Sequence, residues 1–410
     1  MLDWLIVGGG PHGVHLALRL RTEAAVAAAD LRILDDQPRL LERWRRCSRN
    51  TGMRYLRSPA VHHIDVSAGS LQRFAHVRRS RLSRPFTRPY NRPSLELFDR
   101  HCRAVIERHA LTDLHACDRA LRIEPLAQGL RVHLANGAPI ETRQLVLALG
   151  APRKPTWPSW ARALAEEARE TLDHVFDPGF DLSESPAWRH VVVVGAGISG
   201  AQTALRLASA GRKVSLVTRG ALRVEQFDSD PGWQGPMHMN GFAREPDPDA
   251  RREMIRVARH RGSMPPEIHR ALRQAIRDGR IDLHPAEVEG ARPCSRSNDG
   301  RIVLVTSTGR LIADHVLLTT GHATHRPGGE MVDELVETLG LPCAACDYPI
   351  IDRALRWHPR IFVSGPLAEL EIGPVSRNLS GAQRAGDRIV RWARAAADSP
   401  SATRRRALAS

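Results

Sequence analysis

The sequence predicts an α/β protein with two βαβ units, because the same glycine pattern follows an apolar strand twice. Leu2–Val7 runs into Gly8-Gly9-Gly10-Pro11-His12-Gly13, and His190–Val194 runs into Gly195-Ala196-Gly197-Ile198-Ser199-Gly200. A helical pattern follows each loop. In a GxGxxG loop the glycines permit a tight turn, close approach to a pyrophosphate and close packing of helix on strand. We therefore expect two Rossmann-like dinucleotide-binding domains.

The residue that ends the second strand of each unit predicts which nucleotide binds there. Asp35 follows the apolar run Leu31–Leu34, 22 residues after Gly13, where a carboxylate would take the ribose hydroxyls of FAD or NAD. The second unit instead ends Val214–Val217 with Thr218-Arg219, 19 residues after Gly200. A carboxylate would repel a 2′-phosphate, whereas an arginine can accept it. We therefore expect FAD at the first loop and NADPH at the second.

These two loops supply most of the predicted cofactor-binding residues. They are Gly8, Gly10, Pro11, His12, Gly13 and Asp35 for FAD, and Gly195, Gly197, Ile198, Ser199, Gly200 and Arg219 for NADPH.

Two further strands end in glycine and mark where the chain passes between domains. Leu145–Leu149 ends at Gly150, and His315–Thr319 leads to Thr320 and Gly321. We expect a discontinuous FAD domain at 1–160 and 322–397, with the NADPH domain at 186–321 inserted between its parts. Within the NADPH domain, 224–247 reads as a long loop without regular structure, and such insertions commonly act as lids or substrate gates. Residues 398–410 read as a disordered tail.

Between these landmarks the pattern predicts shorter elements. Ser94–His109 has an apolar face after Pro93 and is expected to be a helix. Leu121–Pro125 and Leu130–Leu134 read as two strands of a small sheet that interrupts the first domain, which gives a three-layer ββα arrangement. Helices are also expected at Trp160–Thr171, Asp249–His260, Pro265–Asp278 and Ser380–Ala397, and further strands at Ile302–Thr306 and Arg360–Ser364.

Composition restricts the class of partner. The formal charge of +15 comes almost wholly from arginine, because lysine occurs only at Lys154 and Lys213. These arginines are scattered along the chain, which argues against a nucleic-acid partner, although a positive field favours anionic ligands. No apolar run approaches the roughly 20 residues that span a bilayer, and the first core strand begins next to Met1, so no membrane contact and a cytoplasmic location are expected. Six cysteines are expected to be reduced thiols, and no metal site is predicted.

At this point the order of motifs resembles a known family, the class B flavin monooxygenases. Within it the chain is most similar to the N-hydroxylating lysine/ornithine monooxygenases of siderophore biosynthesis. Asp314, Leu318-Thr319-Thr320-Gly321-His322 and Pro327 follow the pattern D-x3-L/F-A-T-G-Y-x4-H/P, with Thr319 for Ala and His322 for Tyr. Trp44 and Gly52-Met53 resemble the family's W-H-x-G-M flavin segment with residues inserted. The resemblance adds Trp44, Met53, Gly150, Thr320, Gly321, Gly365 and Leu379 to the expected cofactor-binding residues.

The resemblance implies a reaction. NADPH reduces FAD, O2 forms a flavin C4a-hydroperoxide, and one oxygen atom passes to a nucleophilic heteroatom, most simply the nitrogen of a small amine or amino acid. The cofactor carries this chemistry, so no nucleophile–base pair is expected in the protein. In the aligned positions the family's glutamine and lysine fall at Arg57 and His62, and its Asn-Tyr pair falls near Gly262-Ser263. Arg57 could bind a substrate carboxylate or a flavin carbonyl, and His62 could transfer protons.

Three alternatives remain open on the sequence alone. Oxygen could pass to sulfur instead of nitrogen. The pair Cys343/Cys346 forms a CxxC that a flavin disulfide reductase could use. The chain could also be a nucleotide-binding module that has lost catalysis. In each of these cases the protein could be a homo-oligomer.

Overall fold

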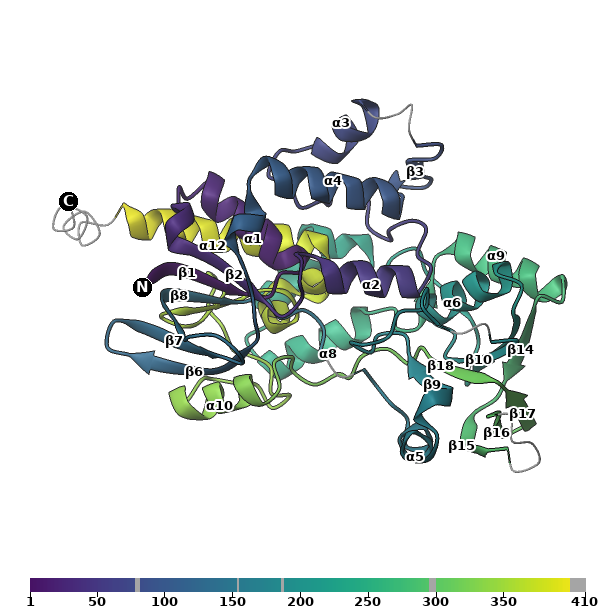
Figure 1. Ribbon diagram of the computed structural model, residues 1–410. Coiled ribbons are helices and arrows are strands. Elements are labelled where there is room, and N and C mark those ends of the chain that lie inside the picture. The colour runs from purple at the N-terminus through teal and green to yellow at the C-terminus, as the bar shows by residue number, and fades with distance from the viewer. Residues whose placement is uncertain (78–81, 153–154, 186–187, 295–299, 399–410) are drawn as a thin grey trace.

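The computed structural model describes residues 1–77, 82–152, 155–185, 188–294 and 300–398, and it contains two separate parallel sheets (Figure 1). The chain begins and ends in one half, with β1 (Leu2–Val7) and α12 (Leu379–Ala397), while the middle of the chain forms the other half. This arrangement confirms the predicted α/β class of one dinucleotide-type domain interrupted by another. Within the described residues, no helix is long and apolar enough to cross a membrane. Of the predicted tail, only Asp398 lies among the described residues.

The first sheet has the strand order β19-β20-β8-β1-β2-β5. Its central strands pair in parallel. In β1, the side chains of Leu5 and Ile6 are fully buried. Parallel strands covered on both faces are expected to be continuous apolar runs, as β1 is. The hairpin β6–β7 continues from β8, as predicted for the small sheet. The strands are β2 (Leu31–Asp35), β5 (His115–Cys117), β6 (Ala120–Leu126), β7 (Gly129–Leu134), β8 (Ile140–Leu147), β19 (Arg356–His358) and β20 (Ile361–Val363).

Helices cover the first sheet and extend toward the second. α1 (Pro11–Thr22) packs beside α12, and α4 (Leu95–Arg108) is capped by Ser94, whose side chain accepts from Leu97 N–H at 3.1 Å. α2 (Glu42–Asn50) points from the first half toward the second (Figure 1). It is a nine-residue helix that the sequence did not predict, because its stretch reads as a polar crossover. The other helices here are η1 (Ala28–Asp30), α3 (Ser70–Val77), η3 (Leu111–Leu114), α10 (Glu330–Leu339), η6 (Gly365–Ala368), α11 (Glu369–Ile372) and η7 (Pro374–Arg377), with the short strands β3 (Phe86–Thr87) and β4 (Arg92–Pro93).

The second sheet has the order β14-β11-β10-β18-β9, all parallel. β10 (His190–Val194), β11 (Lys213–Thr218) and β18 (His315–Leu318) were predicted. The two outer strands, β9 (Leu172–His174) and β14 (Ile281–Pro285), were not. β9 is three residues long and β14 mixes polar with apolar residues, so neither shows a strand pattern without its neighbour. α5 (Ser159–Glu167), η4 (Arg169–Thr171), α6 (Ile198–Ser209), α9 (Pro266–Arg277) and the small sheet β15 (Val288–Pro293), β16 (Ile302–Thr306) and β17 (Gly309–Ala313) complete this half.

The stretch 224–247 is ordered and partly helical, which corrects the expectation of a structureless loop. After β12 (Arg223–Val224) it forms η5 (Pro231–Gln234) and α7 (Pro236–Arg244), and α8 (Pro248–Ala258) and β13 (Ser263–Met264) follow. Two features explain why this segment is ordered. Prolines stand at the starts of η5 and α7, and the buried rings of Trp233 and Phe242 meet edge to face with centroids 5.8 Å apart. The segment packs on the first domain, where Arg384 donates to Trp233 O at 3.1 Å.

Candidate functional site

The first glycine loop has the shape that a bound pyrophosphate needs. Gly8 has φ +118°, and a Cβ there would lie 2.3 Å from Ala148 O. A Cβ on Gly13 would lie 1.8 Å from Gly8 O, so neither position accepts a side chain. A Cβ on Gly10, in contrast, would meet nothing within 4 Å. The open space therefore lies at Gly10, directly before the start of α1.

The start of α1 presents unpaired N–H groups to that space. Gly10 is the N-cap and offers no side chain, so the N–H groups of the first turn have no capping partner. A helix N-terminus of this kind favours a bound anion. These features fit a dinucleotide pyrophosphate, as predicted for FAD.

Asp35 lies against the loop, at the end of β2. Its carboxylate accepts from Gly9 N–H at 2.5 Å and from Gln37 N–H at 2.9 Å. These bonds hold the loop and the strand end together. The role of Asp35 in binding the ribose stays a prediction.

His12 joins the loop to the far end of the sheet. Its Nδ1 lies 2.8 Å from Ser364 Oγ, and the ring is close to Gly365, which has φ +73°. Burial lowers the pKa of His12 to about 4, so the ring is neutral near pH 7. Its buried Nε2 has no hydrogen-bond partner among the described residues. The predicted residues His12 and Gly365 therefore meet at one place.

Other residues assigned by the resemblance lie around this half of the site. Trp44 packs on Phe98 with ring centroids 5.2 Å apart, and Met53 packs against the same core. Gly150 has φ +67° and follows β8. Leu379 begins α12, where Asn378 caps the helix by accepting from Gly381 N–H. Whether these four residues contact FAD is untested and stays a prediction.

The second glycine loop repeats the first. Gly195 has φ +108°, and a Cβ on Gly200 would lie 1.7 Å from Gly195 O. Gly197 is the N-cap of α6, again without a side-chain cap, and Ile198 and Ser199 form the first turn. Thr319 Oγ1 donates toward Val194 O and Gly195 O at 2.9 and 2.8 Å, which fixes the loop to β18. This site also fits a dinucleotide.

Arg219 stands at the end of β11 with most of its side chain in solvent. Its side chain is 82% exposed, and the single ion pair that it forms among the described residues is a 3.8 Å contact with Glu287. A surface pair at that distance contributes little. The guanidinium is therefore available for an anionic group at the end of the second strand, as predicted for a 2′-phosphate.

The segment after β18 connects the two halves. Thr320 Oγ1 contacts Thr156 O and lies 3.2 Å from His174 Nε2, while Thr156 N–H donates to Gly321 O at 2.8 Å. His322 stacks on Phe176 with centroids 4.8 Å apart. Burial lowers the pKa of His174 to about 3 and that of His322 to about 4. Thr320 and Gly321 thus lie where the two halves meet.

Arg57 holds the inserted segment rather than standing free. Its Nε and Nη2 donate to the backbone oxygens of residues 225–227 at 2.6–3.0 Å, and Nη2 also contacts Ser263 Oγ at 3.0 Å. Two aligned positions from different domains, Arg57 and Ser263, are therefore in contact. Nη1 makes no hydrogen bond within the described residues, so any part in binding substrate would fall to that atom.

Within the part of the chain that the structure describes, no hydrogen bond or ion pair joins His62 to Arg57. Burial lowers its pKa, with further lowering from the Arg384 charge. Its neighbour His63 lies against His101, with ring centroids 5.5 Å apart. A role for His62 in proton transfer stays a prediction.

Cys343 and Cys346 lie after α10, and neither is in a disulfide. Burial raises the pKa of Cys343, although Arg326 lies 3.3 Å from its sulfur. A thiol with a raised pKa is less often the reactive thiolate that disulfide exchange needs.

Two residues that join the domains were not predicted. Asn50 is 1% exposed, donates to Val175 O and Phe180 O, and accepts from Leu182 N–H at 3.0 Å. Glu369 is fully buried and contacts Arg252, Arg259 and Arg377. Asn50 is a single amide in a polar helix, and Glu369 is a carboxylate within an apolar stretch. No sequence pattern around either residue indicates its partners.

Two dinucleotide-type loops, one at the start of α1 and one at the start of α6, are typical of a flavoprotein-like oxidoreductase. Comparison with known proteins identifies the family. The chain belongs to the pyridine nucleotide-disulphide oxidoreductase family, whose model matches residues 2–232. A second model, of an FAD-binding domain, matches residues 190–345. Together they confirm the predicted FAD-dependent oxidoreductase that uses a pyridine nucleotide. The FAD model covers the unit that we assign to NADPH. Because both units share one loop and one fold, we base the assignment on Asp35 and Arg219.

Solved structures share the fold across nearly the whole chain. An ornithine hydroxylase from Pseudomonas aeruginosa aligns with a TM-score of 0.74 and 20% identity, covering 96% of this chain and 99% of that one. A Kutzneria ornithine N-hydroxylase with reduced FAD, NADP+ and L-ornithine gives 0.75 and 16%, covering 97% and 99%. A bacillithiol disulfide reductase from Bacillus cereus gives 0.60 and 17%, covering 96% and 99%. A search of curated proteins found no match.

Proposed function

We propose that this chain is an FAD- and NADPH-dependent monooxygenase that transfers one atom of O2 to a nucleophilic heteroatom, with the nitrogen of a small amine or amino acid as acceptor. The observation that carries the proposal is the unequal pair of strand ends: Asp35 is bonded into the first loop, and Arg219 is 82% exposed beside the second. One site then suits a ribose and the other a 2′-phosphate. The full-length similarity in fold to ornithine hydroxylases supports N-hydroxylation over other chemistry.

The proposal assigns a part to each group of residues. FAD, when bound, supplies the redox chemistry and the activation of O2. The start of α1 would hold its pyrophosphate and Asp35 its ribose, while the neutral ring of His12 would keep the loop joined to Ser364. The start of α6 and Arg219 would hold NADPH.

The inserted segment would keep water from the reacting groups. Trp233 is 8% exposed, and a Cβ on Gly373 would lie 3.2 Å from Met239 Sδ, so α7 and η5 pack closely on the first domain. Arg57 holds the start of the same segment through its backbone oxygens. Exclusion of water strengthens the electrostatic interactions in such a site.

A single-turnover experiment tests the reaction class. The FAD-loaded protein is reduced with NADPH and mixed with O2, with and without NADP+, while flavin absorbance and H2O2 are followed. We expect two resolved phases of reoxidation with NADP+ present, little H2O2, and hydroxylamine formation when a suitable amine is added. Single-phase reoxidation with one H2O2 per flavin, whatever amine is added, would overturn the proposal.

Product analysis separates the two heteroatoms. Amines and thioethers of matched size are compared for NADPH oxidation coupled to oxygenated product. Coupling to sulfoxide alone would replace N-hydroxylation by S-oxygenation and leave the monooxygenase class intact.

A further inference from the structure

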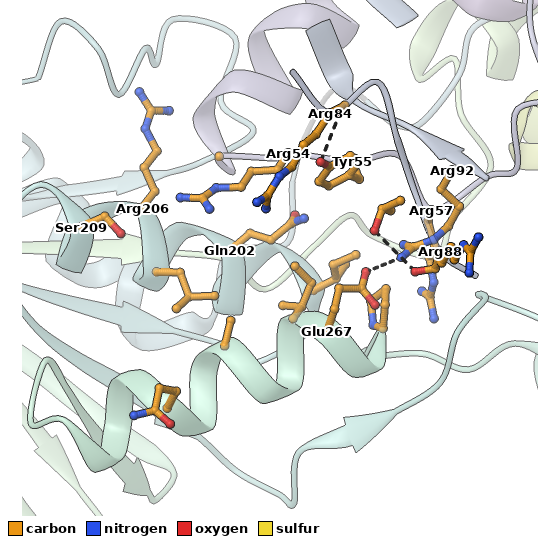
Figure 2. Close-up of a pocket in the computed structure, with 18 of the residues that line it drawn as sticks. Arg54, Tyr55, Arg57, Arg84, Arg88, Arg92, Gln202, Arg206, Ser209 and Glu267 are labelled. Atoms are coloured by element: carbon orange, nitrogen blue, oxygen red, sulfur yellow. Dashed lines mark hydrogen bonds and ion pairs between the residues drawn. The ribbon is translucent and has the colours of Figure 1, made fainter. Parts of the chain in front are cut away.

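A cavity of about 800 Å³ lies between the two domains, on the flank of α6 (Figure 2). One wall comes from the first domain, within residues 52–92, and the other from α6 and α9 of the second. A cavity of this size is typical of small-molecule sites. Arg219 and the residues of the first glycine loop are not among its lining residues. Ile198, which we predict to bind NADPH, and Gly52, beside the predicted flavin residue Met53, form part of its wall, so the cavity adjoins the predicted nucleotide positions and extends beyond them.

The charge of this cavity is strongly one-sided. Seven arginines and a single glutamate, Glu267, are among its lining residues. Figure 2 shows Arg54 and Arg84 near Tyr55, and a second group with Arg57, Arg88 and Arg92 close to Glu267. Like charges gathered in a cleft focus a positive potential and raise the local concentration of anions.

Arginine is common in this chain, so the pairing of these guanidiniums matters more than their number. Elsewhere the arginines gather around carboxylates: Glu369 takes three and Glu371 takes two. In the cavity, the side chains of Arg54, Arg84 and Arg88 have no hydrogen bond or ion pair within the part of the chain that the structure describes. Their charge is therefore not neutralised by the protein.

Arg92 is the buried member of the group. It is 1% exposed, and its Nη2 lies 2.8 Å from Glu267 Oε1. Its buried Nε has no acceptor in the described ranges. A guanidinium hidden from water with an unused N–H is costly unless a ligand completes its bonds.

Part of the remaining wall is apolar. Phe86 lies on the side of the first domain, and Leu205, Ile268 and Ala271 lie on α6 and α9. Free phosphate or another small inorganic ion would leave this surface unused. An anionic group attached to an apolar body would use both parts of the cavity.

We propose that this cavity binds a small organic anion, a phosphate monoester or a carboxylate carried by an apolar or aromatic body. The anionic group pairs with the arginines, for which bidentate contacts to phosphate and carboxylate are favourable. The apolar body packs on Phe86 and Leu205. Arg57, one of the lining residues, is also a candidate for binding the oxygenation substrate. The proposal for this cavity does not depend on the proposed oxygenation, and its test does not use turnover.

Calorimetric titration of the FAD-loaded protein, saturated with NADP+, tests the site. The probes are phenyl phosphate, benzoate and inorganic phosphate. We expect phenyl phosphate or benzoate to bind with one-to-one stoichiometry, at least about tenfold more tightly than inorganic phosphate. Binding should weaken as salt is raised, because screening reduces the attraction.

Two double variants with equal loss of charge locate the binding. Arg84→Ala/Arg88→Ala removes two exposed cavity arginines, and we expect affinity for the organic probe to fall about tenfold or more. Arg270→Ala/Arg273→Ala removes two exposed arginines of α9 that do not line this cavity, and affinity should stay within about twofold. Leu205→Asn should weaken phenyl phosphate but not inorganic phosphate.

Three outcomes would overturn the proposal. They are absence of binding by both organic probes, equal weakening in the two double variants, and inorganic phosphate binding as tightly as phenyl phosphate. If the probe fails to bind in the presence of NADP+ but binds once NADP+ is left out, the probe occupies the nucleotide site, and this form of the first outcome also overturns the proposal. Each variant's melting temperature, compared with that of the parent protein, verifies that the fold is kept.

Discussion

The two glycine loops have nearly the same backbone but different chemistry around them. In each, the first glycine has φ above +100° and the last glycine lies against the first one's carbonyl. What differs is the strand end beside the loop: a carboxylate bonded to Gly9 N–H in one unit, and an exposed Arg219 in the other. The glycine pattern is therefore common to both units, and we predict that one residue at the end of the next strand determines which nucleotide binds.

The largest expected effect separates fold from binding inside the first loop. Gly13→Ala places a methyl group 1.8 Å from Gly8 O and should destabilise the protein by about 3 kcal/mol or more. Gly10→Ala meets no atom within 4 Å, so its melting temperature without FAD should stay unchanged while FAD affinity falls about tenfold or more. Thermal unfolding and flavin titration measure the two quantities. Equal stability of the two apo variants would contradict this division.

Arg219→Ala sharpens the comparison between the units. Loss of a charge-assisted bond should weaken NADPH by on the order of 1.5–3 kcal/mol and leave NADH nearly unchanged. The KM of each nucleotide in flavin reduction gives the result. Arg223→Ala, which removes another arginine just beyond the same strand, is the matched control. Equal changes for NADPH and NADH would rule out a 2′-phosphate contact.

How far the sequence predicts this molecule follows from the same contrast. Both loops, Asp35, Arg219 and the buried strands were predictable because glycine spacing and apolar runs are local patterns. β9 and the contacts of Asn50 were not, because a three-residue strand and a single amide acquire their partners only in the folded chain. Arg57 was assigned by the resemblance, but its bonds to residues 225–227 depend on a segment that reads as a loop and folds into η5 and α7.

Acid should lower the free energy of unfolding through two buried histidines beside the first glycine loop, His12 and His15, which have no counterpart in the second loop. Burial lowers the pKa of His12 and His15 to about 4, against an unfolded value of about 6.5. The unfolded chain therefore binds more protons between these values, so the free energy of unfolding should fall as pH drops from 6.5 to 4. One such group contributes about 1.4 kcal/mol per pH unit at most.

The matched pair His15→Gln and His76→Gln isolates this effect. His15 Nδ1 lies 2.8 Å from Ile64 O, a contact that an amide could keep, whereas His76 is exposed. Denaturant unfolding between pH 4 and 7 should show a shallower pH slope for His15→Gln and an unchanged slope for His76→Gln. The same slope in all three proteins would show that His15 is not the group that titrates.

The smallest expected effect concerns Cys343 and Cys346. If these thiols formed a redox centre, the two nucleotide sites alone would not account for the chemistry. Burial raises the pKa of Cys343, which leaves little thiolate near pH 7. Cys343→Ser and Cys346→Ser should therefore keep NADPH oxidation and product yield within about twofold of the parent protein. Exposed Cys117→Ser serves as control. Loss of NADPH oxidation in both CxxC variants but not in the control would establish a disulfide reductase, because an oxygenase that works through its flavin does not need the thiols.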